Sequence, residues 1–218
     1  MSAAHSTLAS LTSKRRERMV ERQLRERGIC DTRVLAAMRT VQRELFLPPA
    51  ARGQAYRDGA VAIGEGQTMS QPWIVACMTS LLELTGCEQV LEVGTGSGYG
   101  AAVLSCCCAE VTTIERHRSL AVRASTVLWV LGYSNVRVLT GDGARGAPQY
   151  APFDGIVVTA AASGLPPPSL FEQLRPGGAL VCPVKRSDGE YLMRFRGGHE
   201  EMVAPVRFVP LVEAGPEG

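Results

Sequence analysis

A glycine-rich turn is the part of the sequence best suited to hold a ligand. The segment from Val90 to Gly98 places Gly94, Gly96 and Gly98 where an apolar strand is expected to turn into a helix. Glycine at such a turn tolerates positive φ and lets a ligand approach the backbone closely. Because ligands of open α/β sheets bind outside the carboxyl ends of the strands, this turn predicts the floor of a pocket.

Two acidic residues follow at the expected ends of the next two strands. Glu115 lies 17 positions after Gly98, where a carboxylate can accept both hydroxyls of a ribose. Asp142, within Gly141-Asp142-Gly143, could accept an adenine amino hydrogen. Each acid alone is also an ordinary helix cap or turn residue. Together with the glycine turn, at successive strand ends, they predict a nucleoside-type ligand.

Alternating strands and helices are expected to position these residues. The predicted strands are Gln89–Val93, Val111–Ile114, Val136–Leu139, Phe153–Thr159 and Ala179–Val184, and the helices between them are Gly98–Cys108, Ser119–Leu131 and Pro167–Leu174. Continuously apolar strands alternating with helices predict an α/β fold, a Rossmann-like doubly wound, mostly parallel sheet. Residues 191–195 and 206–211, around Gly197-Gly198, predict an antiparallel C-terminal hairpin.

The N-terminal part predicts a helical elaboration. Residues 14–27 form an amphipathic helix ending at Gly28, and acids interspersed among its arginines argue against a nucleic-acid-binding arm. A second helix begins with Asp31 as its N-cap. Residues 53–72 lack helical or strand periodicity, so we expect a long functional loop before a helix over 73–84.

The predicted organisation is one domain preceded by a short tail. We expect a disordered tail over residues 1–13 and a single domain over 14–218. The parts of this domain are the helical and substrate-loop elaboration at 14–85, the donor-binding core at 86–184 and the hairpin region at 185–218.

Composition narrows the classes of protein that remain. The 218 residues are 45% hydrophobic and 20% charged, which excludes wholesale disorder. A net charge of +2 does not favour nucleic acid or an anionic membrane as the main partner. No apolar run approaches the roughly 20 residues of a membrane-spanning helix, so we expect a cytoplasmic protein. Seven cysteines without a Cys-x-x-Cys pair, and only three histidines, predict neither a disulfide framework nor a metal site.

Longer motifs then appear in order along the chain. They are Gly64-x-Gly66-Gln67-Thr68-Met69-Ser70-Gln71-Pro72, Val90 to Gly98 followed by Tyr99, Gly141-Asp142-Gly143, Ala151-Pro152-Phe153-Asp154, Val158-Thr159-Ala160-Ala161-Ala162, Gln173-Leu174 with Pro176-Gly177-Gly178, and Val206-Arg207-Phe208-Val209-Pro210-Leu211. The set resembles the class I S-adenosylmethionine-dependent methyltransferases. More narrowly, it is similar to the protein-L-isoaspartate O-methyltransferase family from about residue 14 to 212.

The resemblance implies a repair reaction on isoaspartyl-containing proteins and peptides. Such enzymes transfer a methyl group from S-adenosyl-L-methionine to the free α-carboxylate of an L-isoaspartyl residue, releasing S-adenosyl-L-homocysteine. The ester collapses to a succinimide without enzymatic help, and part of that hydrolyses to normal aspartate. The resemblance implies no nucleic acid, membrane or metal, and we expect a monomer.

The resemblance also implies roles for individual residues. Ser70 would be the active-site serine, orienting the substrate carboxylate through its hydroxyl. The expected donor-binding residues are Gln67, Thr68, Met69, Ser70, Glu92, Gly94, Gly96, Gly98, Glu115, Asp142 and Gly143. The expected substrate-binding residues are Ile63, Gly64, Thr68, Ser70, Val209, Pro210 and Leu211.

Three other functions stay open at this point. A carboxyl methyltransferase dedicated to one peptide or natural product would share the fold and the donor. A non-catalytic donor-binding paralogue is a second alternative, because Ala62, Met69, Gly100, Ala147 and Lys185 depart from the family pattern. An amide N-methyltransferase would want Asn/Asp-Pro-Pro-aromatic after the fourth strand, where this chain has four residues from Thr159 to Ala162 with three alanines.

Overall fold

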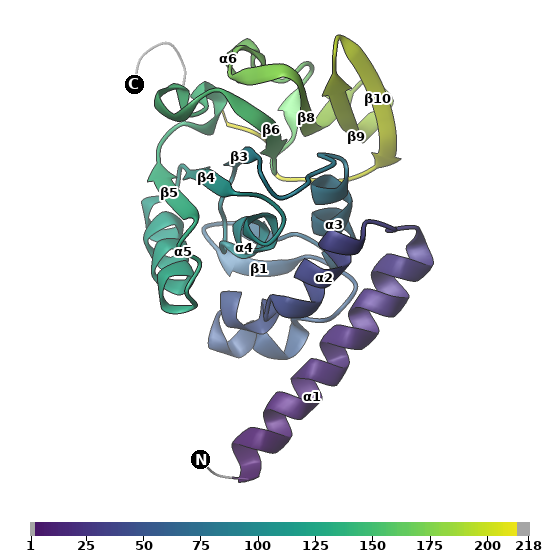
Figure 1. Cartoon of the computed structure of the whole chain (residues 1–218), viewed down its shortest axis with the longest axis vertical. Coiled ribbons are helices and arrows are strands. Elements are labelled where there is room, and N and C mark those ends of the chain that lie inside the picture. The colour runs from purple at the N-terminus through teal and green to yellow at the C-terminus, as the bar shows by residue number, and fades with distance from the viewer. Residues whose placement is uncertain (1–2, 213–218) are drawn as a thin grey trace.

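A mostly parallel sheet forms the centre of the molecule in the computed structural model, which describes residues 3–212, with side chains from Leu11 onward (Figure 1). Its strands run in the order β10-β9-β8-β6-β3-β4-β5, and the short β7 pairs with β8. The strands are β3 (Gln89–Val93), β4 (Glu110–Glu115), β5 (Val136–Thr140), β6 (Phe153–Val158), β7 (Ala162–Ser163), β8 (Leu174–Arg186), β9 (Gly189–Arg196) and β10 (His199–Pro205). The predicted α/β fold class is confirmed, with β9 antiparallel to both of its neighbours, β8 and β10.

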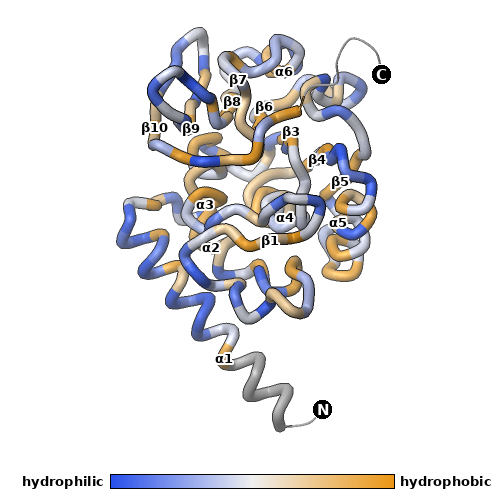
Figure 2. The backbone as a smooth tube through the Cα atoms, turned by 180° about the vertical axis from the view of Figure 1, so that it is seen from behind, coloured by the Kyte–Doolittle hydropathy of each residue, from blue (hydrophilic) through white to orange (hydrophobic). Residues whose placement is uncertain are grey.

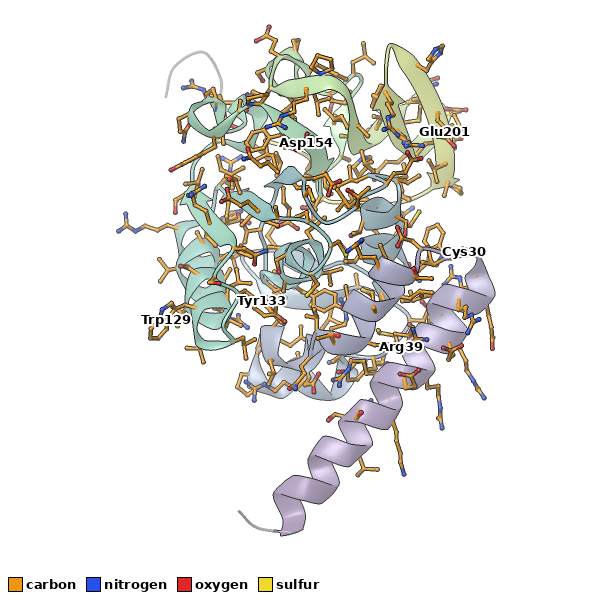
Figure 3. All side chains as sticks on the ribbon, in the orientation of Figure 1. Cys30, Arg39, Trp129, Tyr133, Asp154 and Glu201 are labelled. Atoms are coloured by element: carbon orange, nitrogen blue, oxygen red, sulfur yellow. The ribbon has the colours of Figure 1, made fainter. Side chains whose placement is uncertain are left out.

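Helices pack against the sheet on the stretches that the sequence predicts. They are α4 (Tyr99–Ser105), α5 (Arg118–Val130) and α6 (Pro168–Glu172). The middle strands are buried because apolar clusters lie against them, one shared with the N-terminal helices and α4 and another shared with β8 and β9. Trp129, 81% exposed, points outward from α5 (Figure 3).

The N-terminal helix is longer than predicted. α1 (Ala3–Met19) continues as a π-helical turn over Val20–Leu24 and a 3-10 turn over Arg25–Arg27, and the chain leaves the helix at Gly28 with φ of 90°. The predicted disordered tail over residues 1–13 is therefore replaced by helix from Ala3 onward, while residues 1–2 lie outside the described range. This stretch contains neither glycine nor proline, so nothing in it stops the helix from extending toward the N-terminus.

The second helix begins where its N-cap predicts. In α2 (Thr32–Thr40), Oδ1 of Asp31 accepts hydrogen bonds from the backbone N–H of Arg33 and Val34 at 2.9 and 3.1 Å. Arg39 of this helix lies against α1 (Figure 3) and pairs with Glu17 at 3.0 Å. Two 3-10 turns, η3 (Arg43–Phe46) and η4 (Pro49–Gln54), then lead toward the segment that bears the site.

The expected long loop contains a small hairpin instead. β1 (Val61–Gly64) and β2 (Gln67–Met69) pair antiparallel around Glu65 and Gly66, both with positive φ. The sequence did not reveal it because each strand is three or four residues long, too short for alternation to stand out. α3 (Pro72–Ser80) follows and ends four residues before the predicted Leu84.

The C-terminal hairpin is shifted relative to the prediction. Its second strand is β10, whereas residues 206–211 leave the hairpin and cross the end of the sheet (Figure 2). There the Ala161 N–H donates to the Val209 carbonyl at 2.8 Å, and the Leu211 N–H donates to the Ala161 carbonyl at 2.7 Å. The prediction missed β10 because its first residues are charged and exposed, as an edge strand allows. No helix within residues 3–212 combines the length and apolar character that crossing a membrane requires.

Candidate active site

One large cavity opens at the carboxyl ends of β3 and β4. It has a volume of about 1100 Å³, and much of its lining comes from four segments that lie far apart in the sequence. These are the end of the β1–β2 hairpin, the glycine turn after β3, the end of β4 and the crossing segment 206–211. The predicted site residues that line it are Gln67, Thr68, Met69, Ser70, Glu92, Gly94, Gly96, Glu115, Gly143, Val209, Pro210 and Leu211.

Four predicted site residues lie behind the cavity wall or beside it. Ile63 is buried and reaches toward Gly96, while Gly64 belongs to the exposed turn of the β1–β2 hairpin. Gly98, with φ of 86°, packs against α5. Asp142 caps the short 3-10 turn that follows it, because its Oδ1 accepts from the Ala144 N–H at 3.0 Å. These four residues therefore do not line the cavity themselves, and they adjoin residues that do.

The backbone angles of the turn after β3, and the side chain next to it, both require glycine. Gly94 has φ of 96°, and Gly96 has φ of 53°. A Cβ on Gly94 would lie 2.2 Å from Oγ1 of Thr159, which donates to the Gly94 carbonyl at 2.8 Å. Thr159 therefore fastens the end of β6 to the turn, and only glycine fits between them.

Replacing Gly94 by alanine should damage both stability and the cavity floor. We expect Gly94→Ala to lower the free energy of unfolding by about 1–3 kcal/mol from backbone strain, with a further loss from the Thr159 contact. Gly132→Ala is the matched control, since Gly132 has φ of 83° but nothing within 4 Å of a Cβ. Urea denaturation of both variants measures the difference, and equal losses would contradict the role given to Thr159.

Glu115 is held at the cavity wall by two backbone groups. Its Oε2 accepts from the Gly96 N–H at 2.8 Å and its Oε1 accepts from the His117 N–H at 2.9 Å. The carboxylate thus ties the end of β4 to the glycine turn of β3, and each oxygen retains a lone pair for a ligand. Such a fixed, double acceptor suits a pair of vicinal hydroxyls.

Glu92 is a second buried carboxyl at the same cavity. Burial raises the pKa of Glu92 to about 8, a hydrogen bond from Thr113 opposes the rise, and the charge of Glu115 adds to it. The Thr113 hydroxyl donates to Oε2 at 2.7 Å, and the Thr95 hydroxyl lies 2.7 Å from that of Thr113. A Cβ on Gly100 would lie 2.2 Å from Oε1, so glycine at this departure from the family pattern lets the carboxyl pack against α4.

Because the pKa of Glu92 is raised in the folded protein, the free energy of unfolding should decrease as the pH rises. Between the unfolded pKa near 4.3 and the folded pKa of about 8, the folded state binds more protons, so stability falls as pH rises. We expect the Glu92→Gln variant to show a flatter decline between pH 5 and pH 8. The difference in slope is at most about 1.4 kcal/mol per pH unit. Urea denaturation at three pH values measures it, and identical slopes would contradict the assignment.

Ser70 lines the cavity from the connection between β2 and α3. Its side chain is half-buried at the cavity, while its carbonyl accepts from Nη2 of Arg43 at 2.6 Å. The main chain of Ser70 is thereby fixed from behind. Within residues 3–212, no group of three or more His, Cys, Asp or Glu side chains is arranged to hold a metal ion.

Sequence reasoning missed several lining residues. Arg27 reaches the cavity from the N-terminal helix, stacked over Trp73 at 5.3 Å and paired with Asp58 at 3.2 Å. No local signal marks Arg27, because its place depends on how the 3-10 turn over Arg25–Arg27 meets Trp73 of α3. Arg207 and Phe208 also line the cavity, and they belong to the motif over 206–211 although no role was predicted for them.

The mostly parallel sheet, its antiparallel hairpin and the cavity above the glycine turn define a Rossmann-like methyltransferase fold. A sequence profile described as "Protein-L-isoaspartate(D-aspartate) O-methyltransferase (PCMT)" matches residues 14–215. The chain therefore belongs to the protein-L-isoaspartate O-methyltransferase family. The family expectation drawn from the motifs is confirmed.

Individual relatives match over nearly the whole chain. A protein-L-isoaspartate O-methyltransferase 1 from Rhodopseudomonas palustris is 50% identical, with 96% of this chain and 87% of the relative covered. A protein-L-isoaspartate O-methyltransferase from Opitutus terrae is 47% identical, with 98% and 93% covered. A solved protein-L-isoaspartate O-methyltransferase superposes with a TM-score of 0.80 at 29% identity, over 92% of this chain and 66% of that one. A Plasmodium falciparum protein assigned to the family, solved with S-adenosyl-L-homocysteine, shares the fold with a TM-score of 0.78 at 23% identity, over 91% and 99% of the two chains.

Proposed function

We propose that this chain transfers a methyl group from S-adenosyl-L-methionine to the free α-carboxylate of L-isoaspartyl residues in damaged proteins and peptides. That transfer begins their repair to aspartyl residues. The observation that carries the proposal is the family match over residues 14–215, and the single cavity shared by the Ser70 segment and the glycine turn supports it.

The donor side of the cavity has the groups that S-adenosyl-L-methionine requires. Glu115 offers two anchored acceptor oxygens for the ribose, and Gly94 and Gly96 leave the backbone bare beside it. Gly143 lets the turn after β5 pack against β3, since a Cβ there would lie 2.4 Å from Cγ1 of Val93, and this turn would hold the adenine. Glu92 also lines the cavity and would lie near the methionine end of the donor. A positively charged donor would favour the ionised form of its carboxyl group. The chemistry that the donor supplies when bound is an electrophilic methyl group on a sulfonium.

The remaining proposed donor contacts come from the hairpin and the turn after β5. Gln67, Thr68 and Met69 line the cavity beside Ser70 and would close over the donor and the peptide together. Asp142 would act through the turn that it caps and that presents Gly143. Gly98 and Ile63 would act by holding the glycine turn in place.

The substrate side needs positioning more than acid–base chemistry. A peptide carboxylate has an unperturbed pKa near 4 and is ionised at neutral pH, so the chain need not supply a general base. The Ser70 hydroxyl would donate a hydrogen bond to the carboxylate and orient it. Thr68 and the crossing segment Val209-Pro210-Leu211 would wall the peptide, with Gly64 at the hairpin turn beside it. Positioning and exclusion of water can contribute about 7–11 kcal/mol to such a reaction.

A methyl-transfer assay on paired peptides tests the proposal. One peptide carries an isoaspartyl residue and the other an aspartyl residue at the same position, and both receive radiolabelled donor. We expect label on the isoaspartyl peptide alone. Equal labelling would contradict the specificity, and titration showing S-adenosyl-L-homocysteine binding with no labelling would favour the non-catalytic paralogue.

We further propose that the protein works as a monomer in the cytoplasm. All seven cysteines are free thiols, as a reducing compartment favours. Burial raises the pKa of Cys107, Cys108 and Cys182 to about 12, so these thiols pack as small apolar groups. Light scattering on the eluted protein tests the monomer, with a mass near twice 23.3 kDa as the contradicting result.

A further inference from the structure

Arg43 is a completely buried cation at the back of the cavity wall. Its Nε donates to the Ala55 carbonyl at 2.8 Å and its Nη2 donates to the Ser70 carbonyl at 2.6 Å. Its guanidinium lies 4.6 Å from the centroid of the Tyr99 ring. Within the described part of the chain, no carboxylate forms an ion pair with Arg43.

Stability alone does not account for this residue. Burial lowers the pKa of Arg43, yet a guanidinium stays charged in proteins. A buried charge without an opposite charge is costly, and apolar replacements of buried ionic groups are often neutral or stabilising.

The contacts of Arg43 join the two sides of the cavity. Ser70 lines the proposed substrate side, and Tyr99 lines the cavity as the first residue of α4, directly after the glycine turn. One rigid guanidinium therefore contacts the main chain of Ser70 and the ring of Tyr99 at once. Because the guanidinium is planar and stacks well on aromatic rings, it fixes an orientation that lysine would not reproduce.

We propose that Arg43 is a positioning residue for methyl transfer, which sets the place of Ser70 relative to the glycine turn through the Ser70 carbonyl and the Tyr99 ring. The inference rests on the proposed function, since it assigns Ser70 to the substrate and the turn to the donor. Arg43 touches neither ligand; it acts through the two residues that it contacts. A displacement of Ser70 by about 1 Å relative to the glycine turn can lower the rate of methyl transfer by roughly 100-fold.

The test compares Arg43→Met and Arg43→Lys with a matched arginine elsewhere. Arg194 of β9 is also largely buried, with 15% of its side chain exposed, and pairs with Glu83 at 2.6 Å away from the cavity lining. We expect Arg43→Met to lower kcat for the isoaspartyl peptide by about 30–100-fold while the Kd for S-adenosyl-L-homocysteine changes by less than about threefold. Arg43→Lys should recover part of the loss, since lysine can still donate to one carbonyl. Arg194→Met should lower Tm and leave kcat unchanged.

Three results would overturn the inference. They are an Arg43→Met kcat within about threefold of wild type, an equal loss of kcat in Arg194→Met, and a loss of kcat matched by an equal loss of S-adenosyl-L-homocysteine affinity. If Arg43→Met does not fold, Arg43→Lys takes its place, with an expected loss of about tenfold and an unchanged kcat as the overturning result.

Hydrogen–deuterium exchange separates this inference from the proposed function. In protein saturated with S-adenosyl-L-homocysteine, the backbone over residues 67–71 should exchange faster in the Arg43 variants than in wild type and Arg194→Met. Unchanged exchange there would overturn the role of Arg43 by itself. Failure of the wild-type protein to label the isoaspartyl peptide would instead contradict the proposed function, and the exchange measurement would still decide whether Arg43 holds the Ser70 segment in place.

Discussion

Replacing Ser70 by alanine should lower kcat/KM for an isoaspartyl peptide by about 10–100-fold while S-adenosyl-L-homocysteine binds almost as before. Ser70 lines the cavity and is half-buried, and the hydroxyl is the one polar group of its side chain. A hydrogen bond to a charged partner contributes about 1.5–3 kcal/mol, which sets the expected range. The backbone of Ser70 stays in place, because Arg43 binds its carbonyl and not its side chain.

Ser80→Ala is the matched control for this change. The Ser80 hydroxyl is buried in α3 without a hydrogen-bond partner and lies away from the cavity lining, so its loss should leave turnover unchanged. Steady-state kinetics and calorimetric titration of both variants make the comparison. Unchanged turnover in Ser70→Ala would remove Ser70 from the mechanism, and a parallel loss of S-adenosyl-L-homocysteine affinity would show that the hydroxyl acts mainly on the donor.

The parallel core was predictable because its signals are local. Strands such as Gln89–Val93 are rich in apolar residues and buried, and glycine or an acid marks the points where β3, β4 and β5 end. The β1–β2 hairpin and β10 escaped prediction for the opposite reason. β1 and β2 are too short for their alternation to stand out in the sequence, and β10 is largely exposed at the edge of the sheet, so only pairing with a neighbour reveals these strands.

The residues of the candidate site also divide into those that the sequence predicts and those that only the structure reveals. Glu115 and Gly94 were predictable from their places at strand ends, where the fold leaves few alternatives. Arg27 and Arg43 were not, because each reaches the cavity region through contacts between segments separated by tens of residues. Asp142 illustrates why the role of an acid at a strand end is not fixed by sequence. Such an acid can cap the following turn, as Asp142 does, or it can bind the ligand directly, and the two roles have the same sequence pattern.

Glu115→Gln should weaken S-adenosyl-L-homocysteine binding by about 10–100-fold and disturb the glycine turn with it. Glutamine has one acceptor oxygen, whereas the Glu115 carboxylate accepts from both Gly96 and His117. Whichever backbone N–H meets the amide NH₂ loses its partner and faces another donor. Charge-assisted hydrogen bonds of this kind contribute about 1.5–3 kcal/mol each, so one lost contact accounts for the expected change.

Glu110→Gln on the same strand is the matched control, since Glu110 is exposed at the start of β4 and outside the cavity lining. Calorimetric titration with S-adenosyl-L-homocysteine should find that variant unchanged. The comparison with Ser70→Ala then separates the two sides of the cavity, because Glu115→Gln should lose product affinity where Ser70→Ala loses turnover. Wild-type affinity in Glu115→Gln would place the ribose elsewhere and leave Glu115 as a brace between β4 and the glycine turn.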